Sequence, residues 1–154
     1  MKKTIAIFIL MLVMIPRVAT SRVNGGGSIK LYIPEGVPIT LDALTIYHPS
    51  KKQCDSAPLI TASNSRINPE KLKNQQLRWM ALSRDLLKRW KGDFHYGDTV
   101  LVTANDPAID GLWVIKDTMN KRFKKRGDLL FDQSVRKSGK WRNVEVTRVM
   151  QVTI

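Results

Sequence analysis

Two neighbouring stretches decide the fold: GLWVIKDTMN (residues 111–120) and RGDLLF (residues 126–131), which are separated by five residues. The apolar and β-branched residues of 112–116 predict one strand, and Asp128–Phe131 predicts a second, shorter strand. Asp117 directly follows the first strand, and Asp128 begins the second, eleven residues later. Two carboxylates placed at strand ends are candidates for acid–base chemistry.

Further short strands are predicted on both sides of these stretches. They are Leu44–His48, Leu59–Ser63, Arg78–Leu82, Thr99–Thr103 and Asn143–Ile154. Turn-forming Gly, Pro, Asn and Asp residues separate them. Short strands punctuated by turns predict a mainly β domain, a compact barrel with one or two short helices. One helix is expected over Arg84–Trp90, with Ser83 as its N-cap.

The N-terminal part is predicted to lie outside this barrel. Residues 21–40 include NGGG at 24–27, which is typical of a flexible linker. Residues 29–39 are apolar but contain Pro34 and Pro38, so this piece is expected to be extended rather than helical. The barrel domain is therefore predicted over residues 41–154.

Residues 1–20 have the pattern of a cleavable secretory signal peptide. Lys2 and Lys3 precede the apolar run Ile5–Ile15, and Pro16 ends it. The run is shorter than the roughly 20 residues that a membrane-spanning helix needs. Cleavage near residue 20 predicts a secreted or periplasmic protein with no stable membrane span; the alternative is an uncleaved N-terminal anchor.

The composition limits the chemistry that is expected. Cys54 is the only cysteine, so no internal disulfide can form, and with two histidines we predict no metal site and no cofactor. The formal net charge is +13, and removing Lys2, Lys3 and Arg17 leaves +10. Such a charge attracts anionic cell-wall polymers, lipid headgroups or nucleic acid, or it serves solubility alone.

Three segments together resemble a known family. They are residues 59–63, residues 79–102 and residues 111–131. Their order and spacing resemble the three-Asp (3D) domain, a double-psi β-barrel similar to those of lytic transglycosylase A, the rare-lipoprotein-A-like proteins and the expansins. The pattern of an Asp-Thr followed after eleven residues by a second Asp is met by Asp117-Thr118 and Asp128-Leu129. The resemblance implies a six-stranded double-psi β-barrel.

The chain departs from the family pattern at three places. Residues 120–126 (NKRFKKR) replace the glycine-rich segment that the family has between the two aspartates. Met119 stands where the family has a glycine after Asp-Thr. The family's third aspartate matches Ser83 or Asp85 only loosely. These departures affect the expected shape of the groove but leave the carboxylates Asp117 and Asp128 in place.

The resemblance also implies roles for individual residues. In the similar transglycosylases the second aspartate of the pair is catalytic, which assigns the acid to Asp128 with Asp117 beside it. Thr61 belongs to the triplet that lines the groove in similar proteins. Asn120 and Arg126 flank the pair in sequence and are candidates for substrate contact. The alternative is that both aspartates hold loops through hydrogen bonds to backbone N–H groups.

Three functions therefore remain open. The first is an exported cell-wall protein that acts on peptidoglycan glycan strands as a lytic transglycosylase, using an Asp acid. The second is a non-catalytic wall-binding or wall-loosening module on the same barrel, and either is expected to be a monomer. The third, an exported nucleic-acid-binding protein, rests on charge alone, so nucleic acid is an unlikely partner. The run Lys121–Arg126 is either a solvated loop or a positive wall beside the groove, and Trp141 is the best candidate for an exposed sugar-stacking ring.

Overall fold

The computed structural model describes residues 19–20, 29–50 and 57–154. The predicted signal peptide lies outside the described residues except for 19–20, and Cys54 lies outside them as well. Within the described ranges, no helix combines the length and hydropathy that crossing a membrane requires.

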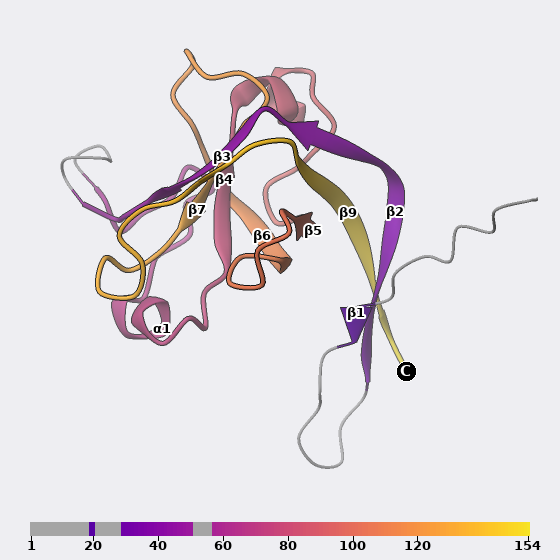
Figure 1. Cartoon of the computed structure of the whole chain (residues 1–154), viewed down its shortest axis with the longest axis horizontal. Coiled ribbons are helices and arrows are strands. Elements are labelled where there is room, and N and C mark those ends of the chain that lie inside the picture. Colours follow the sequence, from indigo (N-terminus) through magenta and orange to yellow (C-terminus); the bar gives the residue numbers. More distant parts are fainter. Residues whose placement is uncertain (1–18, 21–28, 51–56) are drawn as a thin grey trace, which may run out of the picture.

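The described residues form one curled mixed sheet, a half-barrel, which confirms the predicted mainly β class (Figure 1). Its nine strands run in the spatial order β1-β2-β9-β5-β6-β4-β7-β3-β8. Their bounds are β1 Ala19–Thr20, β2 Lys30–Leu41, β3 Ala43–Tyr47, β4 Trp79–Leu82, β5 Thr99–Thr103, β6 Gly111–Thr118, β7 Arg126–Leu130, β8 Lys140–Trp141 and β9 Val144–Thr153. Neighbouring strands are antiparallel except for the parallel pairs β3/β7 and β4/β6.

Alternating apolar residues fill the inside of the curl. Val100 and Val102 of β5 and Trp113 and Ile115 of β6 are buried, while the residues between them are half-exposed. This period of two is what a strand with one buried face requires. The fully buried Trp113 therefore belongs to the core, as its position between apolar residues predicted.

Gly127 allows β7 to enter the core closely. A Cβ atom at this position would lie 2.8 Å from Leu44 Cδ1 and 3.1 Å from Leu41 Cδ1, nearer than carbon atoms pack. The missing side chain lets β7 lie against β3 over its whole length, with Leu44 opposite Gly127 and Thr45 opposite Asp128. The glycine thus fixes the position of the aspartate that follows it.

Part of the segment predicted as a linker is a strand. Residues 30–41 form β2, which pairs antiparallel with β9 from Lys30 opposite Thr153 to Leu41 opposite Val144. A bulge lies between Glu35 and Ile39. The segment is extended, as its prolines predicted, but backbone pairing with β9 orders it instead of leaving it a flexible tether. Its outer half projects from the rest of the sheet together with β9 (Figure 1).

The helical parts differ from the prediction. In place of one helix over Arg84–Trp90 there are two 3₁₀ turns, η1 Arg84–Leu86 and η2 Lys88–Trp90. Leu87 between them is extended, with φ −94° and ψ 138°, which interrupts the helix. The Ser83 hydroxyl makes no capping bond and instead accepts from the Arg126 N–H at 3.0 Å.

A short helix that the sequence reading missed, α1 Pro69–Lys73, lies in the polar segment before β4. The Asn68 side chain accepts from the Lys71 N–H at 3.0 Å, and Pro69 occupies the first turn. Asn followed by Pro is a recognisable helix start.

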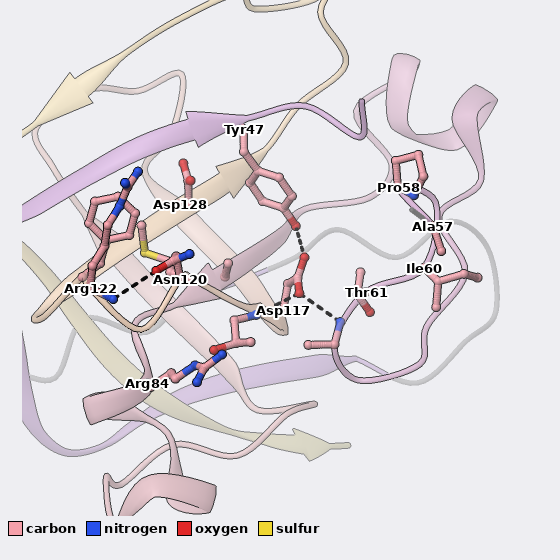
Figure 2. Close-up of a pocket in the computed structure, with 15 residues that line it drawn as sticks. Tyr47, Ala57, Pro58, Ile60, Thr61, Arg84, Asp117, Asn120, Arg122 and Asp128 are labelled. Atoms are coloured by element: carbon pink, nitrogen blue, oxygen red, sulfur yellow. Dashed lines mark hydrogen bonds between the residues drawn. The ribbon is translucent and has the colours of Figure 1, made fainter. Parts of the chain in front are cut away.

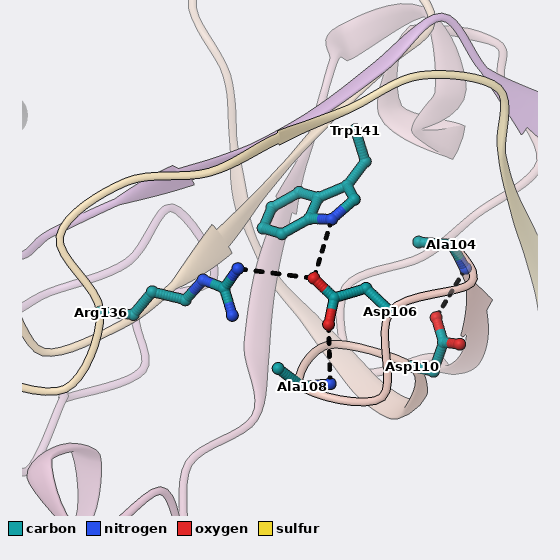
Figure 3. A network of polar contacts seen from close by, with 6 residues as sticks. All are labelled: Ala104, Asp106, Ala108, Asp110, Arg136 and Trp141. Atoms are coloured by element: carbon teal, nitrogen blue, oxygen red, sulfur yellow. Dashed lines mark hydrogen bonds and ion pairs between the residues drawn. The ribbon is translucent and has the colours of Figure 1, made fainter.

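Trp141 is held in a polar network rather than free to stack on a sugar (Figure 3). Its Nε1–H donates to Asp106 Oδ2 at 3.0 Å, and the Arg136 guanidinium lies over its ring with 5.0 Å to the centroid. Arg136 also pairs with Asp106 at 3.4 Å. The Ala108 N–H, the Trp141 indole and Arg136 together lower the pKa of Asp106. The network fastens the 104–110 loop to β8.

Candidate functional site

A cleft of about 590 Å³ opens beside the 57–62 segment, between the ends of β3 and β6 and the middle of β7 (Figure 2). Four of the five residues predicted from the sequence line it: Thr61, Asp117, Asn120 and Asp128. The predicted convergence of the two aspartates on one groove is therefore met. The fifth residue, Arg126, is not part of the lining.

The strand register places the two aspartates on either side of one small residue. Ala81 of β4 lies opposite Asp117 of β6 and opposite Asp128 of β7. Because neighbouring strands are roughly 4.8 Å apart, the two aspartate Cα atoms are about 10 Å apart. Ala81 also lines the cleft. Its methyl group leaves space between the carboxylates for a ligand.

Three hydrogen bonds fix the Asp117 carboxylate. The Tyr47 hydroxyl donates to Oδ2 at 3.1 Å, and the Ala62 and Thr118 N–H groups each donate to Oδ1 at 2.9 Å (Figure 2). These donors hold both carboxylate oxygens in one orientation. Asp117 also ties the 57–62 segment to β6, since Ala62 belongs to that segment.

Asp128 has a different environment. It is half-buried, and the Thr45 hydroxyl donates to its Oδ1 at 2.9 Å. Burial raises the pKa of Asp128 from 3.8 to about 6; the Thr45 hydrogen bond and His48 oppose the rise, and the nearby Asp117 adds to it. This carboxyl is thus shielded in part from water. A buried carboxyl beside a second carboxylate is a frequent arrangement for acid–base chemistry.

Thr61 lies next to this pair, but its hydroxyl is engaged locally. It is within 3.0 Å of the Ser63 hydroxyl and accepts from the Ser65 N–H at 3.2 Å. The side chain is almost completely buried. Thr61 therefore shapes the turn that presents the Ala62 N–H to Asp117.

The last two predicted residues occupy different places. Asn120 is exposed at the cleft, where its Oδ1 accepts from the Arg122 N–H at 3.2 Å. The Arg126 carbonyl accepts a hydrogen bond from the Ser83 N–H, and the Arg126 N–H donates one to the Ser83 hydroxyl. The Arg126 guanidinium lies over the Phe123 ring, 5.4 Å from the centroid. Arg126 thus contacts Phe123, which lines the cleft, but does not line the cleft itself.

The cleft residues that were not predicted from the sequence include Tyr47, Arg84 and Arg122. No local signal marks Tyr47, because only the pairing of β3 with β7 brings its strand to the cleft, where its hydroxyl reaches Asp117. Arg84 was assigned to a helix, and Arg122 to a basic run without individual roles. The cleft therefore holds two arginines besides the two aspartates.

The described residues contain no group of three or more His, Cys, Asp or Glu side chains that could hold a metal ion. No protein-family model, no curated protein and no solved structure matches the chain. Function must therefore be argued from the cleft itself.

Proposed function

We propose that the chain is an exported cell-wall protein whose cleft binds peptidoglycan glycan strands and cleaves them as a lytic transglycosylase. One observation carries the proposal. Asp128 is withdrawn from water in a cleft that it shares with Asp117, and its pKa is raised to about 6. A carboxyl that holds its proton to a higher pH than an ordinary aspartate is suited to protonate a glycosidic oxygen.

The strand order supports a double-psi barrel as the finer description of the fold. Six strands adjacent in the sheet, β9-β5-β6-β4-β7-β3, would form its core, with β1, β2 and β8 added at the edges. The two parallel pairs in this set join segments far apart in sequence, as an interlocked barrel needs. The aspartates belong to the two strands that flank β4.

In the proposed reaction, Asp128 gives its proton to the glycosidic oxygen as the bond to the anomeric carbon breaks. A hydroxyl of the same sugar then attacks that carbon and closes an anhydro ring, so no water is consumed. The proton released by this hydroxyl returns to Asp128. Asp117, fixed by Tyr47, Ala62 and Thr118, supplies negative charge to the positively charged transition state.

The positive charge of the chain supports an anionic polymer as the partner. Lys121, Arg122, Lys124 and Lys125 are all exposed in the loop between β6 and β7, beside the cleft. We infer that this loop attracts the acidic groups of cell-wall polymer to a monomeric, secreted or periplasmic protein. Nucleic acid stays the least supported partner.

A non-catalytic wall-binding module is the second candidate. The hydrogen bonding of Asp117 favours it, because a carboxylate fixed by two backbone N–H groups also serves to hold a loop. Incubation of purified murein with the protein distinguishes the two, with mass spectrometry of the soluble products. Anhydro-sugar ends that are lost in Asp128→Asn, with a fall of about a hundredfold or more, are expected of the transglycosylase. Binding to murein with no products at all would establish the module instead.

A further inference from the structure

Arg84 is a cationic side chain of the cleft that the surrounding protein does not neutralise. It is half-buried and lines the cleft. Its Nε atom is buried without a hydrogen-bond partner, and in residues 29–50 and 57–154 no carboxylate pairs with its guanidinium. A guanidinium that lines a cleft and has no carboxylate partner within these residues is suited to an anion supplied from outside.

The position of Arg84 is fixed by its neighbours. Ser83, the residue before it, is bonded to the Arg126 backbone on β7 through both its N–H and its hydroxyl. The guanidinium lies over the Trp90 ring, 5.1 Å from the centroid. Because Nε is buried, the terminal nitrogens are the ones that a ligand in the cleft can reach. A planar guanidinium presents them in a geometry that matches a carboxylate.

The cleft separates this cation from the proposed acid. Figure 2 shows Arg84 entering from the side opposite Asp128. The charged groups that act on the Asp128 carboxyl are His48 and Asp117. Arg84 can therefore hold an anion without drawing the proton from Asp128.

We propose that Arg84 binds a carboxylate carried by the glycan, which makes the cleft selective for acidic over neutral glycans. Arg122 is a second, exposed cation of the cleft lining. This inference rests on the proposed glycan-binding function. The carboxylate has two sources, the stem peptide of intact murein or the sugar-borne group that is freed when the peptide is removed.

The test measures binding in an Asp128→Asn background, so that no strand is cut. Three soluble probes of similar length are compared: neutral chitin oligosaccharides, murein strands with their peptides, and murein strands stripped by an amidase. The last two separate the sources of the carboxylate. At least one of them is expected to bind about tenfold or more tightly than chitin, and adding Arg84→Gln should remove the difference.

Arg89→Gln is the matched control. Arg89 lies over the same Trp90 ring at 5.4 Å but is exposed and does not line this cleft. Arg89→Gln should leave the selectivity unchanged. Arg84→Lys should reduce the selectivity in part, because an ammonium keeps the positive charge but lacks the paired N–H donors of a guanidinium. Should Arg84→Gln not fold, Arg84→Lys gives the decision, and unchanged selectivity in it overturns the assignment.

The results also separate this inference from the function beneath it. Equal binding of chitin and murein strands, or equal loss in Arg84→Gln and Arg89→Gln, would overturn the role of Arg84 while glycan binding stands. If no probe is bound and wild type leaves murein intact, the proposed function fails, and the inference fails with it.

Discussion

Replacing Asp128 with Asn should make the protein more stable at alkaline pH. The native pKa of Asp128 is raised by burial to about 6, above the value near 3.9 of an unfolded aspartate. The native state therefore holds this proton more tightly than the unfolded state. The resulting contribution to stability is complete below about pH 4 and is lost as the pH rises through about 6.

The size of the effect follows from the same values. The rise of the pKa from 3.8 to about 6 corresponds to about 3 kcal/mol, since each pKa unit is worth about 1.4 kcal/mol. This figure is an upper bound, because Asp128 is half-buried and water screens part of its charge. Asparagine keeps the shape and can still accept from Thr45, but it never ionises. Asp128→Asn should gain up to this amount at pH 8 and almost nothing at pH 4.

Urea unfolding followed by tryptophan fluorescence at pH 4 and pH 8 measures the difference. Asp42→Asn is the control for removing one negative charge, because Asp42 is exposed on the turn between β2 and β3. It should show no comparable change between the two pH values. Two results would contradict the raised pKa of Asp128 in the folded protein. One is an Asp128→Asn protein that is less stable than wild type at pH 8, and the other is a difference from wild type that is equal at both pH values.

Two further substitutions test how the cleft is built. Gly127→Ala should lower the free energy of unfolding by about 1–3 kcal/mol, because its Cβ would meet Leu44 Cδ1 at 2.8 Å. Urea unfolding that matches wild type would contradict the close approach of β7 to β3. Tyr47→Phe removes the donor to Asp117 Oδ2 and should cost about 1 kcal/mol of stability and lower murein cleavage, whereas Tyr32→Phe on the projecting β2 should leave cleavage unchanged. Cleavage equal to wild type in Tyr47→Phe would mean that Asp117 needs no anchor.

The fold was predictable where local pattern and tertiary pairing agree. The alternation around Val100 and Trp113 gave strands that the structure contains. The prediction from local pattern failed where the two strands of a pair lie far apart in sequence. Residues 30–41 contain two prolines and follow a glycine run, so the local sequence does not predict a paired strand. The partner strand is β9, which lies more than a hundred residues later in the chain. The helix expected over Arg84–Trp90 was lost because Leu87 is drawn into the core in an extended conformation.

The two aspartates of the cleft could be predicted from the sequence, but its two arginines could not. The family pattern of two aspartates eleven residues apart identified both residues, and the structure places Asp117 near the end of β6 and Asp128 in the middle of β7. Arg126 was chosen for being near them in sequence, but its guanidinium lies over the Phe123 ring and does not line the cleft. Tyr47 and Arg84 approach from β3 and from the turn after β4, so only the arrangement of strands brings them to the aspartates.

The arrangement also shows how so basic a chain can keep a protonated acid. Four cations in the loop before β7 would be expected to draw the proton from Asp128, since nearby positive charge favours a carboxylate. In the structure, Lys121, Arg122, Lys124 and Lys125 are exposed to water, which screens them, and Arg126 is turned over the Phe123 ring. Burial then becomes the largest influence on the pKa of Asp128, and that pKa rises. The positive charge can attract an acidic polymer from solution while the acid stays in its own, drier environment.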